Sequence, residues 1–360
     1  MSKHSFLIKI STFILKLALT FGIIWYLLLR NPNQILSCLK GFNLYYLLLA
    51  AICYGFHIVY CAIRWKKLAQ MLNIELSYFE AISLTFQGNF FSLVIPGGAI
   101  GGDVVKMSVI TKRSVSGTKM EGAFTVLMDR IIGMIALFAL ALILLIFGYP
   151  LLLNISIPNI ALTLGTKQFM LLGLVLLCIS GLAASCVIFF HKLFRKIKIF
   201  DKIINLVNKL SNNKIDRLIL STDTYASKWP QLTILTIASI FLVHIMTVIP
   251  FGFLLTGLNV KFSILALLLA TIVGNIAGLI PLFPGGLGAR DLAIVTILAS
   301  SGIQPDDAKA AQVIYTSLVI LFALLGGVFF VFDKGRKKLD KDNLPPNVPQ
   351  SSIESPTKVK

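Results

Sequence analysis

The sequence predicts an all-α, polytopic membrane protein, and three observations support this fold class. Of its 360 residues, 57% are hydrophobic and only 13% are charged, whereas soluble domains carry about a quarter charged residues. Several charge-free runs reach the roughly 20 residues that a helix needs to cross a bilayer. Finally, one glycine- and proline-containing pattern occurs twice, in residues 88–103 and 274–291.

The two repeated stretches read GNFFSLVIPGGAIGGD and GNIAGLIPLFPGGLGARD. Both begin with Gly-Asn, contain Pro-Gly-Gly and end on an aspartate seven positions after the proline. Paired Gly/Pro interruptions at matching places in two halves of an apolar chain indicate a transporter-like site. The alternative is a plain loop between two spanning helices, because Pro-Gly-Gly often marks one.

The first two apolar segments predict the orientation of the chain. Residues 10–29 follow a basic start without a small-residue cleavage site, so we interpret them as a retained first span. Residues 44–63 form the second span. The cluster Arg64, Lys66 and Lys67 behind it marks the cytoplasmic side, which places the N-terminus inside as well.

Residues 79–95 and the short run that follows them predict a re-entrant hairpin. If 79–95 crossed the membrane, the next basic residues would lie outside and every later loop would invert. The run 104–110 is too short to cross back and contains Lys106. A hairpin that enters from the cytoplasm and turns at the glycines satisfies both constraints. Its turn would have to be buried in protein or line a wet cavity.

The later segments complete an inverted repeat. The expected order is an outward span, a return, a second outward span, a hairpin entering from outside and a final return, at residues 123–148, 168–190, 231–256, 262–291 and 310–332. Inverted repeats with broken helices that meet near the midplane are a common transporter plan.

The predicted organisation is a single membrane domain, residues 1–332, with about six full transmembrane helices and two re-entrant hairpins. Its halves cover about 44–148 and 231–332. Between them, the basic segment 191–228 is either an amphipathic helix on the inner leaflet or a helix on the protein's own cytoplasmic face. The tail 333–360 is rich in Pro, Ser and Lys and is expected to be disordered.

The distribution of charge predicts the location. Most of the 33 Lys and Arg residues fall on one predicted side, which we expect to be the cytoplasmic side of a bacterial inner (plasma) membrane, with both termini in the cytoplasm. The net charge of +18 then indicates anionic lipid headgroups rather than nucleic acid. A homo-oligomer is left open.

Charged residues inside apolar segments are the candidate site, because they are unfavourable there and usually mark a ligand site or pathway. The second limb of each hairpin begins after a glycine-rich turn, where a helix N-terminus favours phosphate or carboxylate. The expected substrate contacts are Arg290, Arg130, Lys106, Gly97, Gly98, Gly101, Gly285, Gly286, Gly288, Asn89 and Asn275. The expected gating or coupling carboxylates are Asp103, Asp129 and Asp291.

The alternative role for these arginines is to neutralise the aspartates. Neighbouring residues on a helix do not face each other, so Asp129–Arg130 and Arg290–Asp291 are not expected to be self-contained pairs. Pairing between the two repeats is left open as an alternative, and a gate made of such pairs would be functional too.

Two intramembrane histidines and one pair of glycines are interpreted as structural contacts between helices. His57 and His244 lie inside spans, where a hydrogen bond between helices is more frequent than a proton-carrying role. Gly274 and Gly278 form a small-xxx-small pair that permits close helix packing.

No sequence pattern supports an enzyme. A nucleophile–histidine–acid arrangement, a His/Cys metal cluster, a P-loop and a dinucleotide fingerprint are all missing from the sequence, so neither catalysis nor a metal or other cofactor is expected.

Three segments carry a family resemblance: PGGAIGGDVVKM, LMDRIIGMIALFALALILL and PLFPGGLGARDLAIV. They resemble the lysylphosphatidylglycerol synthase transmembrane (flippase-like) family, which includes the membrane half of the bacterial multiple peptide resistance factor. The resemblance covers about residues 10–332 and implies movement of a lipid or lipid-linked headgroup between leaflets. Many relatives carry Glu in place of Asp291 and an acidic residue in place of Gly133. No soluble aminoacyl-transferase domain follows the last span, so synthesis of lysyl-phosphatidylglycerol is not expected.

The sequence therefore predicts a flippase-like transporter for a phospholipid or a polyprenyl-linked anionic headgroup. Two alternatives remain. Inverted hairpins also serve secondary transporters of small anionic solutes, and the chain could be a non-transporting membrane subunit of an envelope-synthesis complex.

Overall fold

The computed structural model describes residues 41–95, 99–113, 119–155, 163–189, 214–279 and 288–332. All regular secondary structure in these ranges is helical, which confirms the all-α class. The predicted first span, most of the basic linker and the tail lie outside the described residues.

Five helical segments of the described part are long and apolar enough to cross a membrane. They are α3 (Leu44–Met71), α6 (Lys119–Leu153), α7 (Leu164–Phe189), the continuous run α11–η1–α12 (Trp229–Gly257) and α15 (Pro305–Phe332). Within the run Trp229–Gly257, α11 covers Trp229–Ser239, the π-helical turn η1 covers Ile240–Ile245 and α12 covers Met246–Gly257. Each coincides with a predicted span.

The C-terminal end of α3 corrects one prediction. The helix continues to Met71 instead of ending near residue 63. Consequently, Arg64 and Lys66 lie within α3 and are buried, so they are not solvated flanking charges. Lys66 donates from Nζ to the Leu76 carbonyl at 2.7 Å.

Two pairs of shorter helices form the predicted hairpins. The first consists of α4 (Tyr78–Val94) and α5 (Ala99–Arg113), and the second of α13 (Ile264–Ala277) and α14 (Ala289–Ser300). At about 1.5 Å of rise per residue, none of the four reaches the ~30 Å of a bilayer core. The turns with the Pro-Gly-Gly sequences lie outside the described residues. How the hairpins sit in a membrane stays a prediction.

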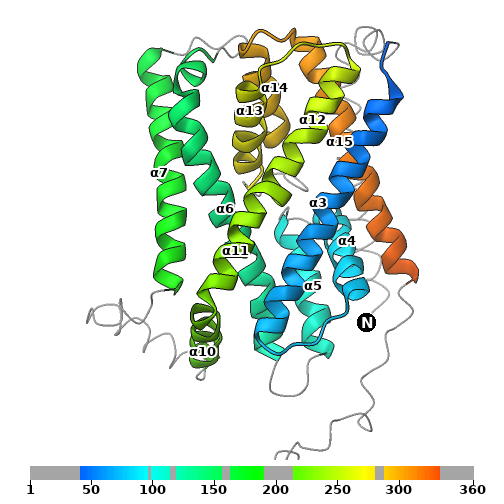
Figure 1. The fold of residues 1–360 in the computed structure, drawn as a ribbon, viewed down its shortest axis with the longest axis vertical. Helices are drawn as coiled ribbons and strands as arrows, with labels where there is room; N and C mark the ends of the chain where they lie inside the picture. Colours follow the sequence, from blue (N-terminus) through cyan, green and yellow to red (C-terminus); the bar gives the residue numbers. More distant parts are fainter. Residues whose placement is uncertain are drawn as a thin grey trace, which may run out of the picture.

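The two hairpins occupy opposite ends of the molecule (Figure 1), with α4 and α5 in its lower half and α13 and α14 in its upper half. Each hairpin packs on the last long helix of the other half: α4 contacts α15, and α13 contacts α6. The helices that precede the hairpins, α3 and α12, contact each other. This reciprocal packing is the arrangement expected of an inverted repeat.

Glycines bring the two halves close together. A Cβ at Gly326 of α15 would clash with the Phe86 carbonyl oxygen of α4, and a Cβ at Gly148 of α6 would clash with Leu269 of α13. Small residues at such crossings let helix backbones approach closely. The hairpin of each half is therefore fastened to the other half.

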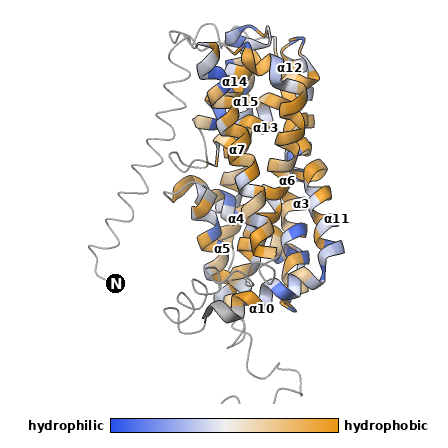
Figure 2. Ribbon diagram, turned by 90° about the vertical axis from the view of Figure 1, so that its left-hand side faces the viewer, coloured by the Kyte–Doolittle hydropathy of each residue, from blue (hydrophilic) through white to orange (hydrophobic). Residues whose placement is uncertain are grey.

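Hydrophobic residues predominate along most of the molecule's length (Figure 2). Large hydrophobic side chains such as Ile146, Phe147, Phe169 and Val331 are exposed there, as expected for helices that face lipid tails. A hydrophobic core contributed by both halves fills the interior.

The described end of the linker packs on the protein itself. Helix α10 (Lys214–Ser227) lies at the lower end of the molecule. Tyr225 donates to the Leu68 carbonyl at 2.9 Å, and Lys228 donates to the Met71 carbonyl at 2.8 Å. These bonds satisfy carbonyls at the end of α3, where a helix lacks partners of its own. For this part, packing on the protein's own face is the correct alternative.

Candidate functional site

Apart from Lys66, the buried charged residues of the described part fall into two clusters with their polar neighbours, one beside each hairpin. The first-half cluster consists of Arg64, Asp103, Lys106, Asp129 and Arg130. The second-half cluster consists of Arg290, Asp291, Gln312, Tyr315 and Thr316.

The first hairpin places Asp103 through a close helix crossing. A Cβ at Gly102 would clash with the Gly88 carbonyl oxygen, so α5 presses directly on α4. At Gly101, an added Cβ would lie 2.9 Å from the Ile95 Cβ atom. The glycines of this limb thus serve helix packing, and they set Asp103 against α6.

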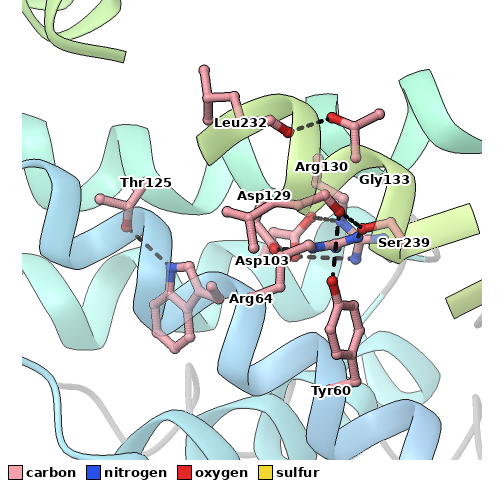
Figure 3. Close-up of polar contacts among 12 residues, drawn as sticks. Tyr60, Arg64, Asp103, Thr125, Asp129, Arg130, Gly133, Leu232 and Ser239 are labelled. Carbon is pink, nitrogen blue, oxygen red and sulfur yellow. Dashed lines mark hydrogen bonds and ion pairs between the residues drawn. The ribbon is translucent and has the colours of Figure 1, made fainter. Parts of the chain in front are cut away.

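Asp103 binds Arg130 of α6 with both carboxylate oxygens (Figure 3). Arg130 donates from Nε to Oδ2 and from Nη2 to Oδ1, the latter at 3.1 Å. A two-point contact of this kind uses the planar guanidinium fork. The Arg130 side chain is still 43% exposed, whereas that of Asp103 is 12% exposed. Arg130 therefore presents part of its charge to the outside of the protein.

Asp129 pairs with Arg64 instead of with its neighbour Arg130 (Figure 3). The Arg64 Nε lies 2.7 Å from Asp129 Oδ1, and Nη1 donates to Ser239 Oγ at 3.0 Å. This pair is buried, with side-chain exposures of 6% for Arg64 and 11% for Asp129. The expectation that Asp129 and Arg130 do not pair with each other is confirmed.

Arg64 is a residue that the sequence interpretation missed. We counted it as a flanking charge because it follows an apolar run. However, no glycine or proline interrupts residues 56–72, and this absence of a helix breaker was the signal that α3 continues. Arg64 is then carried into the interior on a face that also buries Trp65 and Leu68.

Gly133 leaves the space that Arg64 occupies. A Cβ at this position would lie 3.3 Å from both terminal nitrogens of Arg64. An acidic residue here would therefore meet the guanidinium. With glycine in place, the first-half cluster holds three cations and two carboxylates, and its formal charge is +1.

Lys106 carries the charge that no carboxylate matches. It is 8% exposed and takes part in no ion pair within the described part of the chain. Its ammonium lies 5.0 Å from the centre of the Trp65 ring, a cation–π contact. Thr125 orients this ring by accepting from Trp65 Nε1 at 3.0 Å.

The second-half cluster contains a pair that we did not expect. Arg290 Nε lies 3.0 Å from Oδ1 of its neighbour Asp291, so the prediction against this pair was wrong. Asp291 occupies the third position of α14 and turns back to accept from the Gly288 backbone N–H at 3.3 Å. Its carboxylate thereby lies at the helix end, within reach of the long Arg290 side chain.

Further donors from α15 hold the same carboxylate. Gln312 Nε2 donates to Asp291 Oδ1 at 2.7 Å, and Thr316 Oγ1 donates to Oδ2 at 3.4 Å. The signal for both was their spacing of four residues within an apolar helix, which puts them on one face. Arg290 also lies over the Tyr315 ring at 5.4 Å. This cluster is neutral, and the Arg290 side chain is only 12% exposed.

The two clusters are built on equivalent contacts. The hairpin aspartate is bound from the helix that follows, by Arg130 in one half and by Thr316 in the other. The second limb crosses a glycine of the first limb: a Cβ at Gly88 would lie 2.9 Å from Lys106 Cε, and a Cβ at Gly274 would lie 2.5 Å from Ile294 Cγ1.

These pairs each lie within one half. The alternative of neutralisation between repeats therefore does not apply to the described pairs.

The remaining predicted residues have structural contacts or lie outside the described part. Asn275 donates to Thr247 at 3.2 Å, and His244 Nε2 lies 3.0 Å from the Gly133 carbonyl oxygen, as expected for bonds between helices. A Cβ at Gly278 would lie 3.4 Å from Arg290 Cβ. Asn89 is half-buried in α4. Outside the described residues lie Gly97, Gly98, Gly285 and Gly286.

Apolar spans around buried charge pairs on two opposed hairpins define a multi-pass integral membrane protein. Within this class, the family model described as "Lysylphosphatidylglycerol synthase TM region" matches residues 13–327, and the chain belongs to that family. A UPF0104 membrane protein of Pyrococcus horikoshii is 24% identical over 315 residues, which cover 82% of this chain and 88% of the relative. A second, from Methanothermobacter thermautotrophicus, is 24% identical over 305 residues, 80% of this chain and 85% of the relative. No solved structure matches the chain.

Proposed function

We propose that the protein moves a lipid with an anionic headgroup between membrane leaflets. The observation that carries this proposal is the charge excess of the first-half cluster. Lys106 has no carboxylate partner among the described residues, and Arg130 is 43% exposed. A singly charged phosphate would neutralise the cluster, and unpaired charge inside a membrane protein usually serves a ligand or pathway.

The roles proposed for the charged residues differ from those expected from the sequence, where Arg290 was a substrate contact as well. Arg290 is bound to Asp291, and the N-terminus of α14 already holds that carboxylate. In the state described here, Lys106 and Arg130 are the headgroup contacts, whereas Arg290 and Asp291 hold the second hairpin against α15. The acyl or prenyl chains stay in the bilayer along the apolar outer surface.

Reconstitution tests the proposal. The purified protein is placed in liposomes of phosphatidylcholine and phosphatidylglycerol that contain a fluorescent phosphatidylglycerol, and dithionite quenching reports how much label reaches the outer leaflet. Lys106→Met is expected to reduce translocation at least tenfold because it removes the unmatched charge. The matched control is Lys309→Met, which removes an exposed lysine paired with Asp306 at 2.9 Å.

Three outcomes distinguish the candidates. Equal loss in both variants, or none in Lys106→Met, contradicts the proposed role of Lys106. Uptake of a soluble phosphate ester without lipid movement would favour a transporter of small anions. Absence of both activities in the native protein would favour a subunit without transport activity.

Labelling with an impermeant thiol reagent tests the orientation. A cysteine at Asp306, just before the last span, is expected to react from outside, and a cysteine at Lys119 is expected to be protected. Strong labelling of position 119 from outside would contradict a first hairpin that enters from the cytoplasm.

A further inference from the structure

Helix α3 passes both charged clusters and carries a titratable group between them. On α3, the Tyr54 ring lies 6.1 Å from the Tyr315 ring, which Arg290 covers, and Arg64 binds Asp129. His57 stands between Tyr54 and Arg64 in the sequence, at spacings that keep all three near one face of the helix. Along the axis, it is about 5 Å from Tyr54 and about 10 Å from Arg64.

The imidazole of His57 is incompletely bonded. Its Nδ1 atom is buried and has no hydrogen-bond partner among the described residues. Buried polar atoms are almost always bonded, so each exception calls for a missing water, ion or functional role. The ring packs against Tyr54, with centroids 5.6 Å apart. Its electrostatic neighbours are His244, Arg64 and the Val243 carbonyl.

The elements packed around His57 carry few other charged or titratable groups near it. The charge of Arg64 is balanced by Asp129 of α6 at 2.7 Å. His244 comes from η1, a π-helical turn, which is a feature frequent at functional sites. Helix α12 contains no titratable side chain, and those of α4, Tyr78 and Glu80, lie in its first turn. Tyr315 of α15 packs against Tyr54, which in turn packs against His57.

We propose, on the basis of the function proposed above, that His57 binds the proton that couples headgroup movement to a proton gradient. Nδ1 takes up the proton, and the imidazolium adds a positive charge between the two clusters. An anion about 10 Å away and this proton would each strengthen the binding of the other by on the order of tenfold, at an effective dielectric constant of about 20. Histidines within membrane spans serve such relays in other transporters.

Proton binding is tested without relying on transport. The full-length protein, labelled with ¹⁵N-histidine, is placed in nanodiscs containing phosphatidylglycerol. The chain has four histidines, so His57→Gln identifies the His57 signal, and His244→Gln serves as the matched control because an amide can still donate to the Gly133 carbonyl. The His57 signal is expected to change from neutral imidazole towards imidazolium as the pH falls from 8 to 4. A signal that stays neutral throughout overturns the proposal.

Coupling is tested in the liposome assay with opposite pH gradients. Reversing the gradient is expected to change the initial translocation rate of the native protein and of His244→Gln at least fivefold. In His57→Gln, the two directions are expected to differ less than twofold. A native rate that ignores the gradient, or a gradient response retained by His57→Gln, overturns the coupling. If no variant moves lipid but His57 still titrates, the proposed function fails while proton binding at His57 stands.

Discussion

The two charged clusters share a scaffold and differ in their charge and exposure. Both set an aspartate at the start of a hairpin's second limb and bind it from the next long helix. The arginine side chain is 43% exposed in the first-half cluster (Arg130) and 12% exposed in the second (Arg290). In the first hairpin Lys106 packs over Gly88, whereas in the second hairpin Ile294 packs over Gly274.

This difference distinguishes the contacts that hold each hairpin together from the charge that could bind a substrate. The contacts between limbs persist in both halves because they hold each hairpin together. The excess charge is present in one half alone, so under the proposed function a headgroup enters at the first-half cluster. The second-half cluster, neutral and internally bonded, acts as a closed end. Three experiments can sharpen or break this comparison.

The largest effect is expected at Arg64. Arg64→Ala leaves Asp129 buried without a cation and should destabilise the protein by about 3–5 kcal/mol. The measurement is thermal unfolding in detergent micelles, with Arg64→Met/Asp129→Leu as the control that removes both charges. The double variant should recover most of the loss. Equal stability of the native protein and Arg64→Ala would show that the pair is dispensable.

Glycine-to-alanine changes should lower stability by less than Arg64→Ala does. They show which of the two hairpins has the more rigid helix crossing. Gly102→Ala places its Cβ against the Gly88 carbonyl of the backbone, whereas Gly274→Ala meets the Ile294 side chain, which can shift. Overpacking costs about 1–3 kcal/mol, so we expect Gly102→Ala at the upper end of this range and Gly274→Ala at the lower end. Gly173→Ala on α7, with open space at its Cβ, is the control. The reverse order of melting temperatures would contradict the rigid crossing in the first hairpin.

The smallest change in stability is expected at Arg130. Because the Arg130 side chain is 43% exposed and a glutamine amide can still donate to Asp103, Arg130→Gln should lower stability by about 1 kcal/mol yet slow lipid translocation several-fold. Arg290→Gln should lower stability by about 1–3 kcal/mol, the typical effect of losing one partner of a buried hydrogen-bonded group, since other donors still hold Asp291. A stable Arg290→Gln protein with normal transport, beside a normal Arg130→Gln protein, would remove both arginines from the site.

Sequence reasoning located the five described spans and the paired short helices because their signal is local; the number of spans and the re-entry of the hairpins stay predictions. Apolar length identifies α6 and α15, and the glycine-proline punctuation identifies both hairpins. It also selected Asp103, Lys106 and Arg130 as site residues, and these lie together in the first-half cluster. Which of them bind lipid stays a prediction.

The pairing of charges could not be predicted in the same way. Arg64 is buried because Asp129 and Ser239, which are 65 and 175 positions away in the sequence, supply its partners. Arg290 pairs with its neighbour because Asp291 turns back to cap its own helix, a conformation that the spacing rule for helix surfaces does not describe. Such facts depend on tertiary packing.

The reciprocal packing of the hairpins also constrains how the protein is made. Helix α4 packs on α3 and α5, but the partner that covers Phe86 is α15, which begins only at Pro305. While a ribosome synthesises the chain, the first hairpin must therefore wait, with Phe86 uncovered, until nearly the whole membrane part has emerged. A nascent chain cut short before Pro305 would leave that hairpin without its partner and open to quality-control proteases. The packing of the first hairpin is thus completed only when α15, the last helix described, has been synthesised.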